Sequence, residues 1–519
     1  MTAKFWLDKG YTLQIGRQNE EAIKCYEKAL ELDPDNAHAY SSMGTAYVAW
    51  KRQYQKAVEC YRKAIELKPV NAYTYNAMGN VYVSWGGQYE KAIECFQKAI
   101  ELKPLKAAAY CSMGKVYADW YRQYDKAMEY YQKAIDLKPD YAEAYFNMGI
   151  TYQEGIKDYE KAMEYYRKAL NLKPKFAVVY CKMALTYQAW KQDNVKAVAY
   201  FEKAIKLKPN YAYAYYRMGI TYQNWYGYNV TSGNRYQKAI ECYQKAVKFN
   251  PKHANAYANM GMAYQSWNDQ YDKAMECYQK AIELKPDNAY TYSSLGTIYL
   301  SWKQDYQKAI ECYEKSIALK PDYAYAYFFM GTAYAEWNGQ NEKAIECYKK
   351  VLEINPNDEM AYYNMGNAYS HLNKQGNPSV ENYQKALECY QKAIDLKPDF
   401  DRPYLNMANV YKHWDGQYEK AIECYKRILA LKPDSAYIYS LIGIAYQNWT
   451  LEYQKAMDCY QKAIELKPDY AFAYFNIGLA YDTSGDRNQA VSCIKKASEF
   501  GNKDAEQWLL DNEAENFNY

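Results

Sequence analysis

Cysteine and histidine are the residues of this sequence that could act as nucleophiles, general bases or metal ligands. The chain has 519 residues, among them thirteen cysteines and four histidines. Ten of the cysteines recur at one place of a repeated pattern: Cys25, Cys60, Cys95, Cys242, Cys277, Cys312, Cys347, Cys389, Cys424 and Cys459. Equivalent residues of successive repeats cannot all come within bridging distance, so we expect free, buried thiols in a reducing compartment.

Neither residue type forms a pattern that is typical of an active site. His371 and His413 hold the same place in successive repeats, but no cysteine or carboxylate cluster completes a metal site with them. The motifs GxxxxGKS/T, GxGxxG, GxSxG and HExxH are absent, so no phosphate cradle, nucleophile elbow or zinc-protease helix is indicated. We therefore predict a protein that is not an enzyme and that needs no metal and no cofactor.

The charge balance narrows the choice of partner. The chain has 65 Lys and Arg against 61 Asp and Glu, a formal charge of +4. Binding to nucleic acid or to an acidic membrane normally needs a basic surface, so neither partner is expected. There is no apolar run of about 18 residues and no apolar stretch near the first residue, so we predict neither a membrane span nor a secretory signal. The expected location is the cytoplasm.

Prolines mark a repeat that runs from end to end. Pro34, Pro69 and Pro104 are 35 residues apart, and the interval continues through Pro468 except for two steps of 42 residues. Apolar residues spaced i, i+3 and i+7, such as Tyr40, Met43 and Tyr47, predict a first helix in each repeat. A second amphipathic stretch follows and ends before the next proline. About fourteen such units predict an all-α solenoid rather than a set of separate domains.

The residues at fixed places of the unit resemble the tetratricopeptide repeat (TPR) family, whose pattern is W-x2-L-G-x2-Y followed by A-x3-F and A-x4-P. The first part appears as Tyr75, Met78, Gly79 and Tyr82, and the second as Ala92, Phe96, Ala99 and Pro104. The resemblance implies a right-handed superhelical solenoid of helix-turn-helix units. We expect a continuous array over residues 1–503, with seven-residue insertions near 226–235 and 373–381. Residues 504–519 should form a capping helix and a frayed tail.

The turn between the two helices departs from the family pattern. From Gly44 to Ala57 there are 13 residues, whereas the first and last units have 12, as from Gly10 to Ala22. Ten of the longer turns carry tryptophan, for example Trp50. One interpretation is a ring that fills the wider turn, and the other is a solvent-facing row of rings that binds something. The two insertions are predicted to be flaps beside the groove, or else drift in tolerant loops.

In TPR proteins the first helices line a concave groove, at places −6, −3, −2, +1 and +4 relative to the glycine of the repeat. Here tyrosine recurs at −6 and −3 and asparagine at −2 and +1. Asparagine has a donor and an acceptor, so it can hold an extended backbone without reading side chains, and tyrosine adds stacking area. The predicted peptide-binding residues are Asn80, Asn147, Tyr213, Tyr216, Asn259, Tyr290, Tyr325, Tyr363, Asn364, Asn367, Asn406, Asn409, Tyr437 and Asn476.

The leading prediction is therefore a non-catalytic scaffold that binds an extended peptide or partner protein in its groove. Three alternatives stay open: the targeting or regulatory subunit of a separate enzyme such as a glycosyltransferase, a structural solenoid that self-associates, and carbohydrate binding on the aromatic groove. A groove lined only for solubility would also give this pattern of residues.

Overall fold

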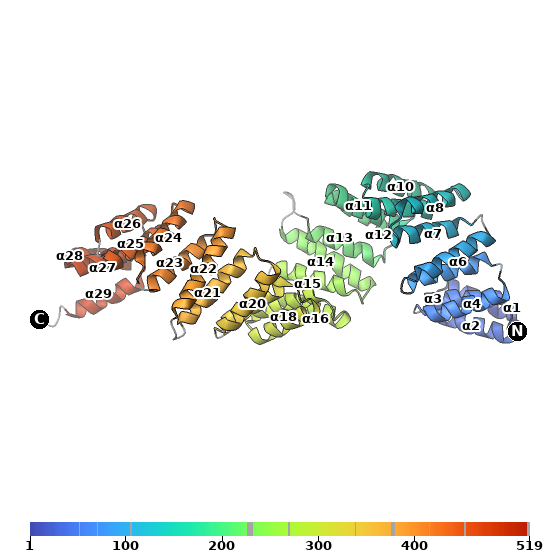
Figure 1. The fold of residues 1–519 in the computed structure, drawn as a ribbon, viewed down its shortest axis with the longest axis horizontal. Coiled ribbons are helices and arrows are strands. Elements are labelled where there is room, and N and C mark those ends of the chain that lie inside the picture. Colours follow the sequence, from blue (N-terminus) through green and yellow to red (C-terminus); the bar gives the residue numbers. More distant parts are fainter. Residues whose placement is uncertain are drawn as a thin grey trace. The chain divides into compact units, whose positions relative to one another are not determined.

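A computed structural model describes residues 1–515, except 51, 70, 104–105, 226–231, 268–269, 338, 375–378, 415 and 451–452. The chain divides into two compact units, residues 1–268 and 269–519 (Figure 1). All regular secondary structure in the described residues is helical. The prediction of an all-α array of tandem helix-turn-helix units is confirmed.

The first unit is a row of helical hairpins in which the odd-numbered helices are the first helices of the repeats and the even-numbered helices are the second. The first helices are α1 (Ala3–Ile15), α3 (Ala37–Ala49), α5 (Ala72–Ser84), α7 (Ala107–Asp119), α9 (Ala142–Ile150) with the π-helix η1 (Thr151–Ile156), α11 (Ala177–Lys191), α13 (Ala212–Gln223) and α15 (Ala254–Ser266). The second helices are α2 (Asn19–Leu32), α4 (Tyr54–Leu67), α6 (Tyr89–Leu102), α8 (Tyr124–Leu137), α10 (Tyr159–Leu172), α12 (Asn194–Leu207) and α14 (Ser232–Phe249).

The second unit continues the same alternation. Its second helices are α16 (Tyr271–Leu284), α18 (Tyr306–Leu319), α20 (Asn341–Ile354), α22 (Val380–Leu396), α24 (Tyr418–Leu431), α26 (Tyr453–Leu466) and α28 (Arg487–Glu499). Its first helices are α17 (Ala289–Ile298) with the π-helix η2 (Tyr299–Lys303), α19 (Ala324–Glu336), α21 (Glu359–Lys374), α23 (Asp401–His413), α25 (Ala436–Thr450) and α27 (Ala471–Ser484), and α29 (Lys503–Glu515) follows them.

Most hairpins close on one aromatic ring of the second helix, whereas in the last hairpin, α27–α28, Ile494 takes its place against Gly478. In the second repeat the Tyr61 ring is 2% exposed and packs against Gly44 of the first helix. A Cβ atom at Gly44 would lie 2.9 Å from the Tyr61 ring, so a larger residue would force the helices apart. Burying a side chain of this size stabilises the fold by about 1.5–3 kcal/mol. The Gly and Tyr places of the repeat are therefore two halves of one contact.

The extra residue of the 35-residue repeat lies at the end of the first helix. In the second repeat the Gln53 N–H donates to the carbonyl of Tyr47, six residues back, at 3.1 Å. In the first repeat the matching bond runs five residues back, from Gln18 to Leu13. The following turn has a positive φ one residue later, at Arg52 instead of Arg17. A wider turn, closed by a hydrogen bond six residues back, thus absorbs the added residue, and in two repeats the end of the first helix is a π-helix, η1 or η2.

The turn tryptophans make two kinds of contact. Trp120 stacks on Tyr89 of the preceding hairpin with ring centroids 4.2 Å apart, and Trp414 stacks in the same way on Tyr383 at 6.0 Å. Trp225 stacks instead on Tyr222 of its own hairpin at 6.0 Å, so a ring that fills its own turn stays a prediction. Trp120 is still 54% exposed, and the tryptophan row as a binding surface stays a prediction.

The described part of each insertion lengthens a second helix at its N-terminal end. Helix α14 has 18 residues and α22 has 17, where α4 has 14. The predicted flaps themselves, at residues 226–231 and 375–378, lie outside the described residues.

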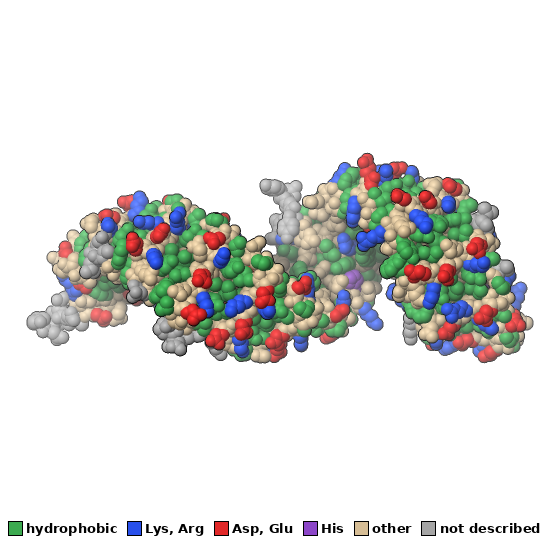
Figure 2. Space-filling view, viewed as in Figure 1, with side chains coloured by type: hydrophobic (Ala, Val, Ile, Leu, Met, Phe, Trp, Pro, Cys, Tyr) green, Lys and Arg blue, Asp and Glu red, His purple; other side chains and the backbone are tan. Residues whose placement is uncertain are grey.

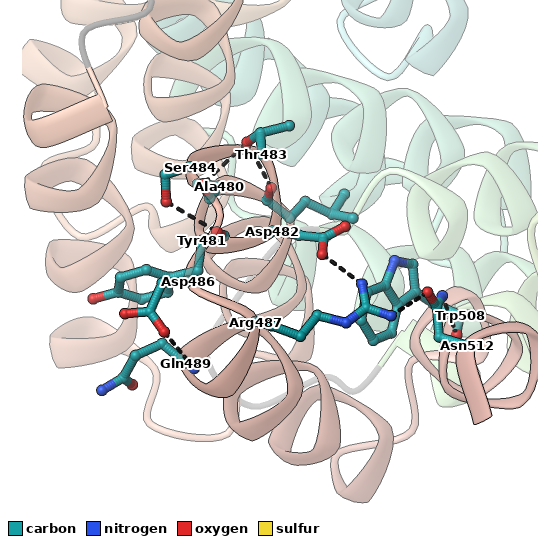
Figure 3. Close-up of polar contacts among 11 residues, drawn as sticks. Ala480, Tyr481, Asp482, Thr483, Ser484, Asp486, Arg487, Gln489, Trp508 and Asn512 are labelled. Carbon is teal, nitrogen blue, oxygen red and sulfur yellow. Dashed lines mark hydrogen bonds and ion pairs between the residues drawn. The ribbon is translucent and has the colours of Figure 1, made fainter. Parts of the chain in front are cut away.

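Helix α29 packs on the last hairpin of the second unit. Arg487 donates to Asp482 at 2.7 Å and also to Asn512, and its guanidinium lies 4.7 Å from the centre of the Trp508 ring (Figure 3). Trp508 and Leu509 lie against a buried cluster that includes Ile494. This helix therefore covers apolar surface of α28.

Candidate functional site

The predicted groove residues lie along the odd-numbered helices, and this surface is called the first-helix surface below. Its tyrosines at −6 are the most accessible: Tyr213 is 42% exposed, Tyr290 53%, Tyr325 41% and Tyr437 49%. Asn80 is exposed, and the other nine predicted residues are partly exposed. The side chains are thus within reach of a ligand, and their hydrogen bonds decide which of them are available.

Many polar side chains at +1 and +4 serve the core. The buried tyrosine of the second helix donates its hydroxyl to a glutamine at +4, as from Tyr243 to Gln223 at 2.7 Å, or bonds with a residue at +1, as Tyr61 does with Thr45 at 3.0 Å. The same arrangement joins Tyr26 to Gln14, Tyr166 to Gln153, Tyr460 to Gln447, Tyr313 to Thr297, Tyr348 to Thr332 and Tyr390 to Asn367. A buried hydroxyl without a partner costs about 1–3 kcal/mol, which explains these polar residues without a ligand.

Phenylalanine at that core place releases the groove residue. Phe96 has no hydroxyl to satisfy, and Asn80, at +1 of its hairpin, is exposed and accepts a hydrogen bond from Ser112 of the next repeat at 3.3 Å. Phe201 has the same effect on Gln188, which donates to Thr221 of the next repeat at 2.7 Å. In these two hairpins the amide makes a hydrogen bond to the next repeat and none to the core ring.

A connected cluster of predicted residues joins α21 to α23 in the second unit. The Asn406 amide donates to the Tyr363 hydroxyl at 3.2 Å and to the Asn367 carbonyl at 2.7 Å. Asn367 also accepts from the buried Tyr390 hydroxyl at 2.8 Å. Phe400, which precedes α23, packs against Tyr363 with ring centroids 5.1 Å apart. This set of side chains is called the amide cluster below.

A similar pair joins α13 to α15 in the first unit. The Asn259 amide donates to the Tyr216 hydroxyl at 3.4 Å. Burial raises the pKa of Tyr216, so its hydroxyl stays protonated and keeps a hydrogen to donate. His253, which precedes α15, packs against Tyr216 with ring centroids 4.5 Å apart. This set is called the amide pair.

The other predicted asparagines do not join either group. Asn147 donates to the buried thiol of Cys111 at 3.2 Å, and Asn476 donates to the carbonyl of Phe472 in its own helix at 2.7 Å. Asn364 and Asn409 are partly exposed. The structure thus brings together five of the fourteen predicted residues through hydrogen bonds, namely Tyr216, Asn259, Tyr363, Asn367 and Asn406.

A group of aromatic rings in contact with one another precedes the amide cluster in the sequence. Tyr323 packs between Tyr290 and Tyr325, at 4.9 and 5.7 Å, and Tyr325 packs on Phe329 at 4.5 Å. These rings come from α19 and from the repeat before it, so they form one continuous aromatic patch. Such a patch offers stacking area at low entropic cost.

A hollow of about 460 Å³ lies on the first-helix surface of the first unit. Helices α1, α3 and α5 line it with hydroxyl, amide and aromatic groups, including Tyr11, Ser42, Thr45 and Tyr73. Ser42 donates to the Tyr11 hydroxyl at 2.9 Å. Lined in this way, the hollow suits a polar, uncharged group.

The thiols are not placed for chemistry. All but Cys459 and Cys493 are buried, and all thirteen are free. Burial raises the pKa of Cys60 to about 12, so that thiol is a poor nucleophile at neutral pH. Within the described ranges no group of three or more His, Cys, Asp and Glu could hold a metal ion. No helix in that part of the chain is both long and apolar enough to cross a membrane. Lys and Arg are interspersed with Asp and Glu on the visible face of each unit (Figure 2).

Family models match most of the chain. The model described as TPR repeat matches residues 16–49, 51–86, 85–119, 123–154, 227–266, 268–301, 303–336, 338–373, 381–413, 415–448 and 452–485. The chain belongs to the tetratricopeptide repeat family. A second TPR model matches residues 142–176, 177–211 and 473–500, and a Sel1 repeat model matches 324–351. The matched models are all repeat models, and the array is a TPR scaffold.

Solved TPR structures resemble parts of the array or its length. A MamA protein is 27% identical over 36% of this chain and 95% of that one, with a TM-score of 0.31. YrrB, described as a TPR protein with an unusual peptide-binding site, is 27% identical over 38% and 93%, with a TM-score of 0.32. Yeast Tom70 is 18% identical over 83% and 99%, with a TM-score of 0.34. Comparison with curated proteins gave no match.

Sequence reasoning missed the rings at the start of α15 and α23. His253 and Phe400 each lie eight places before the Gly (or Ala) of their repeat, outside the groove places that the family pattern indicates. A further signal was present in the sequence: tyrosine occupies place −3 in the two 42-residue repeats, at Tyr216 and Tyr363, and in none of the others.

Proposed function

We propose that this TPR scaffold binds an extended segment of a partner protein on its first-helix surface, and that the amide cluster is the centre of that site. The Asn406 amide uses its N–H groups on Tyr363 and Asn367, so its carbonyl oxygen is left as an acceptor. The Tyr363 hydroxyl accepts from Asn406 and keeps its own hydrogen to donate. A donor beside an acceptor is the complement of a peptide group.

The observation that carries the proposal is the position of these atoms. Asn406 and Tyr363 are held by bonds within the protein yet are partly exposed. A side chain that is already fixed loses little entropy when a ligand binds. The aromatic patch of Tyr290, Tyr325 and Phe329 belongs to the same unit and offers apolar contact for side chains of the segment. Together they support recognition of main chain and apolar side chains.

The free thiols support a reducing compartment, and we place the protein in the cytoplasm. A role as the regulatory subunit of a separate enzyme would use the same surface with an enzyme as the partner. Self-association of the array stays a prediction, and a mass that grows with protein concentration in light scattering would support it.

To test the proposal, a library of random linear peptides is displayed, and peptides that bind the intact protein are selected from it. Binding of the selected peptide, made synthetically, is then measured with the wild type and with Asn406→Ala. We expect the substitution to weaken binding about tenfold, which corresponds to one lost hydrogen bond of about 1.4 kcal/mol. Asn476→Ala is the matched control, because Asn476 holds the same place of its repeat and bonds only to its own helix in Phe472. Equal affinity for wild type and both variants would reject the proposal.

A further inference from the structure

Both 42-residue repeats carry a tyrosine at −3. At that place the remaining repeats have Leu, Ser, Asn, Cys, Phe or Ala, so Tyr216 and Tyr363 distinguish the two lengthened repeats from all the others. The residue that each tyrosine meets also has an equivalent place, because Asn259 and Asn406 stand at −2 of the following repeat. Two independent sequence features, length and residue type, thus coincide twice in the chain.

The structure gives both copies the same contacts. Asn259 donates to Tyr216 and Asn406 donates to Tyr363, each across a sequence separation of 43 residues. Each tyrosine also lies against the buried ring of its own second helix, with centroids 6.1 Å apart and an interplanar angle of 46° for Tyr216–Tyr243 and for Tyr363–Tyr390. The amide pair and the amide cluster are therefore two versions of one arrangement.

A third ring completes the match. His253 packs on Tyr216 as Phe400 packs on Tyr363. His253 accepts a hydrogen bond at Nδ1 from the Ala256 N–H at 3.2 Å, which requires that nitrogen to be unprotonated. Burial also lowers the pKa of His253. At neutral pH an uncharged ring, His253 or Phe400, therefore lies against the tyrosine of each site.

From this duplication we infer that the chain carries two peptide sites of one chemistry, one in each compact unit, and that a single chain binds two like segments. The inference rests on the proposed function and adds the number of sites to it. Each site would hold one peptide group between a tyrosine hydroxyl and an asparagine carbonyl. The uncharged ring beside it favours a segment whose side chain at that point is apolar.

The environment makes the two sites unequal in affinity. In the first unit Arg217 stands beside Tyr216, where the second unit has Asn364 beside Tyr363. The amide cluster also includes Asn367, where the first unit has Ile220. We therefore expect tighter binding at the amide cluster than at the amide pair.

The experiment counts peptides bound per intact chain by isothermal titration calorimetry, with the library-selected peptide as the probe. We expect two peptides on the wild type, an affinity lowered about tenfold at one of the two sites in Asn259→Ala and at the other in Asn406→Ala, and lowered affinity at both in the double variant. The variants Tyr216→Phe and Tyr363→Phe keep the rings and remove only the hydroxyls. They should weaken their own site alone, which separates lost recognition from lost folding. Asn476→Ala should still bind two.

Each other result decides a different point. One peptide per wild-type chain, bound more weakly by Asn406→Ala and unchanged in Asn259→Ala, would overturn the second site and leave the proposed function standing. Two peptides whose affinity neither substitution lowers would overturn both. A library that yields no binder to the intact chain would also count against both.

Discussion

The amide pair of the first unit and the amide cluster of the second differ in the acceptor that satisfies the core tyrosine. At +1 the first has Ile220 and the second has Asn367. As a result the buried Tyr243 hydroxyl bonds to Gln223 at +4, whereas the buried Tyr390 hydroxyl bonds to Asn367 itself. In the second unit the acceptor that satisfies the core also accepts from Asn406 at 2.7 Å.

The comparison shows that the choice of acceptor for one core hydroxyl connects or separates core and surface. In the amide cluster a chain of hydrogen bonds runs from a buried tyrosine to the exposed face. In the amide pair the core hydroxyl donates to Gln223 and Asn259 donates to Tyr216, so these two bonds share no acceptor, although Asn259 also interacts with the Tyr243 hydroxyl. Hydrogen bonds that share an acceptor depend on one another, so the second unit should respond more strongly to changes in either.

The largest effect should be common to both sites. A Cβ atom at Gly219 would lie 2.6 Å from the Tyr243 ring, and one at Gly366 would lie 2.6 Å from the Tyr390 ring. We expect Gly219→Val and Gly366→Val each to destabilise the hairpin by about 2–3 kcal/mol, because the buried ring cannot move aside. Hydrogen exchange of amides in α14 and α22 measures the local free energy of unfolding.

The same substitution in one unit should leave exchange in the other unit unchanged, which serves as an internal control. A loss at Gly366 no larger than that of a valine at an exposed helix position would mean that the ring contact does not close the hairpin.

An intermediate effect should separate the two sites. Asn367→Ala removes the acceptor of two donors, Tyr390 and Asn406, and should cost about 2 kcal/mol. Gln223→Ala removes the acceptor of one donor, Tyr243, and should cost about 1 kcal/mol. Both values follow from denaturant unfolding monitored by local hydrogen exchange.

A double-mutant cycle sharpens this prediction. Asn367→Ala and Asn406→Ala should couple by about 0.5 kcal/mol or more, whereas Gln223→Ala and Asn259→Ala, which share no acceptor, should couple less. Additivity in both units would show that the amide cluster is no more connected than the amide pair.

The smallest effect depends on pH and should occur in the first unit alone. Because burial lowers the pKa of His253 in the folded state, the unfolded chain takes up the proton first. The stability that neutral His253 supports is complete above its unfolded pKa of about 6.5 and is lost as the pH falls through its lower folded value. Tyr216, which packs on His253, stays neutral because burial raises its pKa.

The measurement is peptide binding at each site, isolated by Asn406→Ala or Asn259→Ala, at pH 7 and pH 5. Acid should weaken the site beside His253 and spare the site beside Phe400, and His253→Phe should remove the difference. Equal weakening at both sites, or persistence of the effect in His253→Phe, would assign the pH dependence to another group.

The fold could be predicted from the sequence because every repeat shows the same pattern of helix-forming residues. Helix periodicity, the terminal prolines and the paired small and aromatic places recur at a fixed interval, so errors in one unit are corrected by the next. The wider turn after the first helix could not be predicted. It depends on one backbone hydrogen bond, from Gln53 to Tyr47 in the second repeat, and side-chain patterns do not reveal it.

The candidate site was predictable in outline only. The family pattern indicates which helix faces the groove, and the asparagines and tyrosines there were found. The family pattern does not indicate which of these side chains are already hydrogen-bonded within the protein, since that depends on contacts between neighbouring repeats. Asn367 and Asn80 hold the same place and both bond to the next repeat, yet only Asn367 also satisfies a buried hydroxyl. The difference follows from Tyr390 and Phe96 on the opposite helix.

The pairing of core tyrosine with groove amide also bears on how such a protein acquires new ligands. Exchanging one tyrosine of a second helix for phenylalanine changes no surface residue, yet it releases a groove side chain that was previously held, as Phe96 releases Asn80. Specificity in this array can therefore change by mutation of the interior, with the polar surface residue already in place before it is used. An engineer could apply the same step, one hairpin at a time, and leave the outer face of the scaffold untouched.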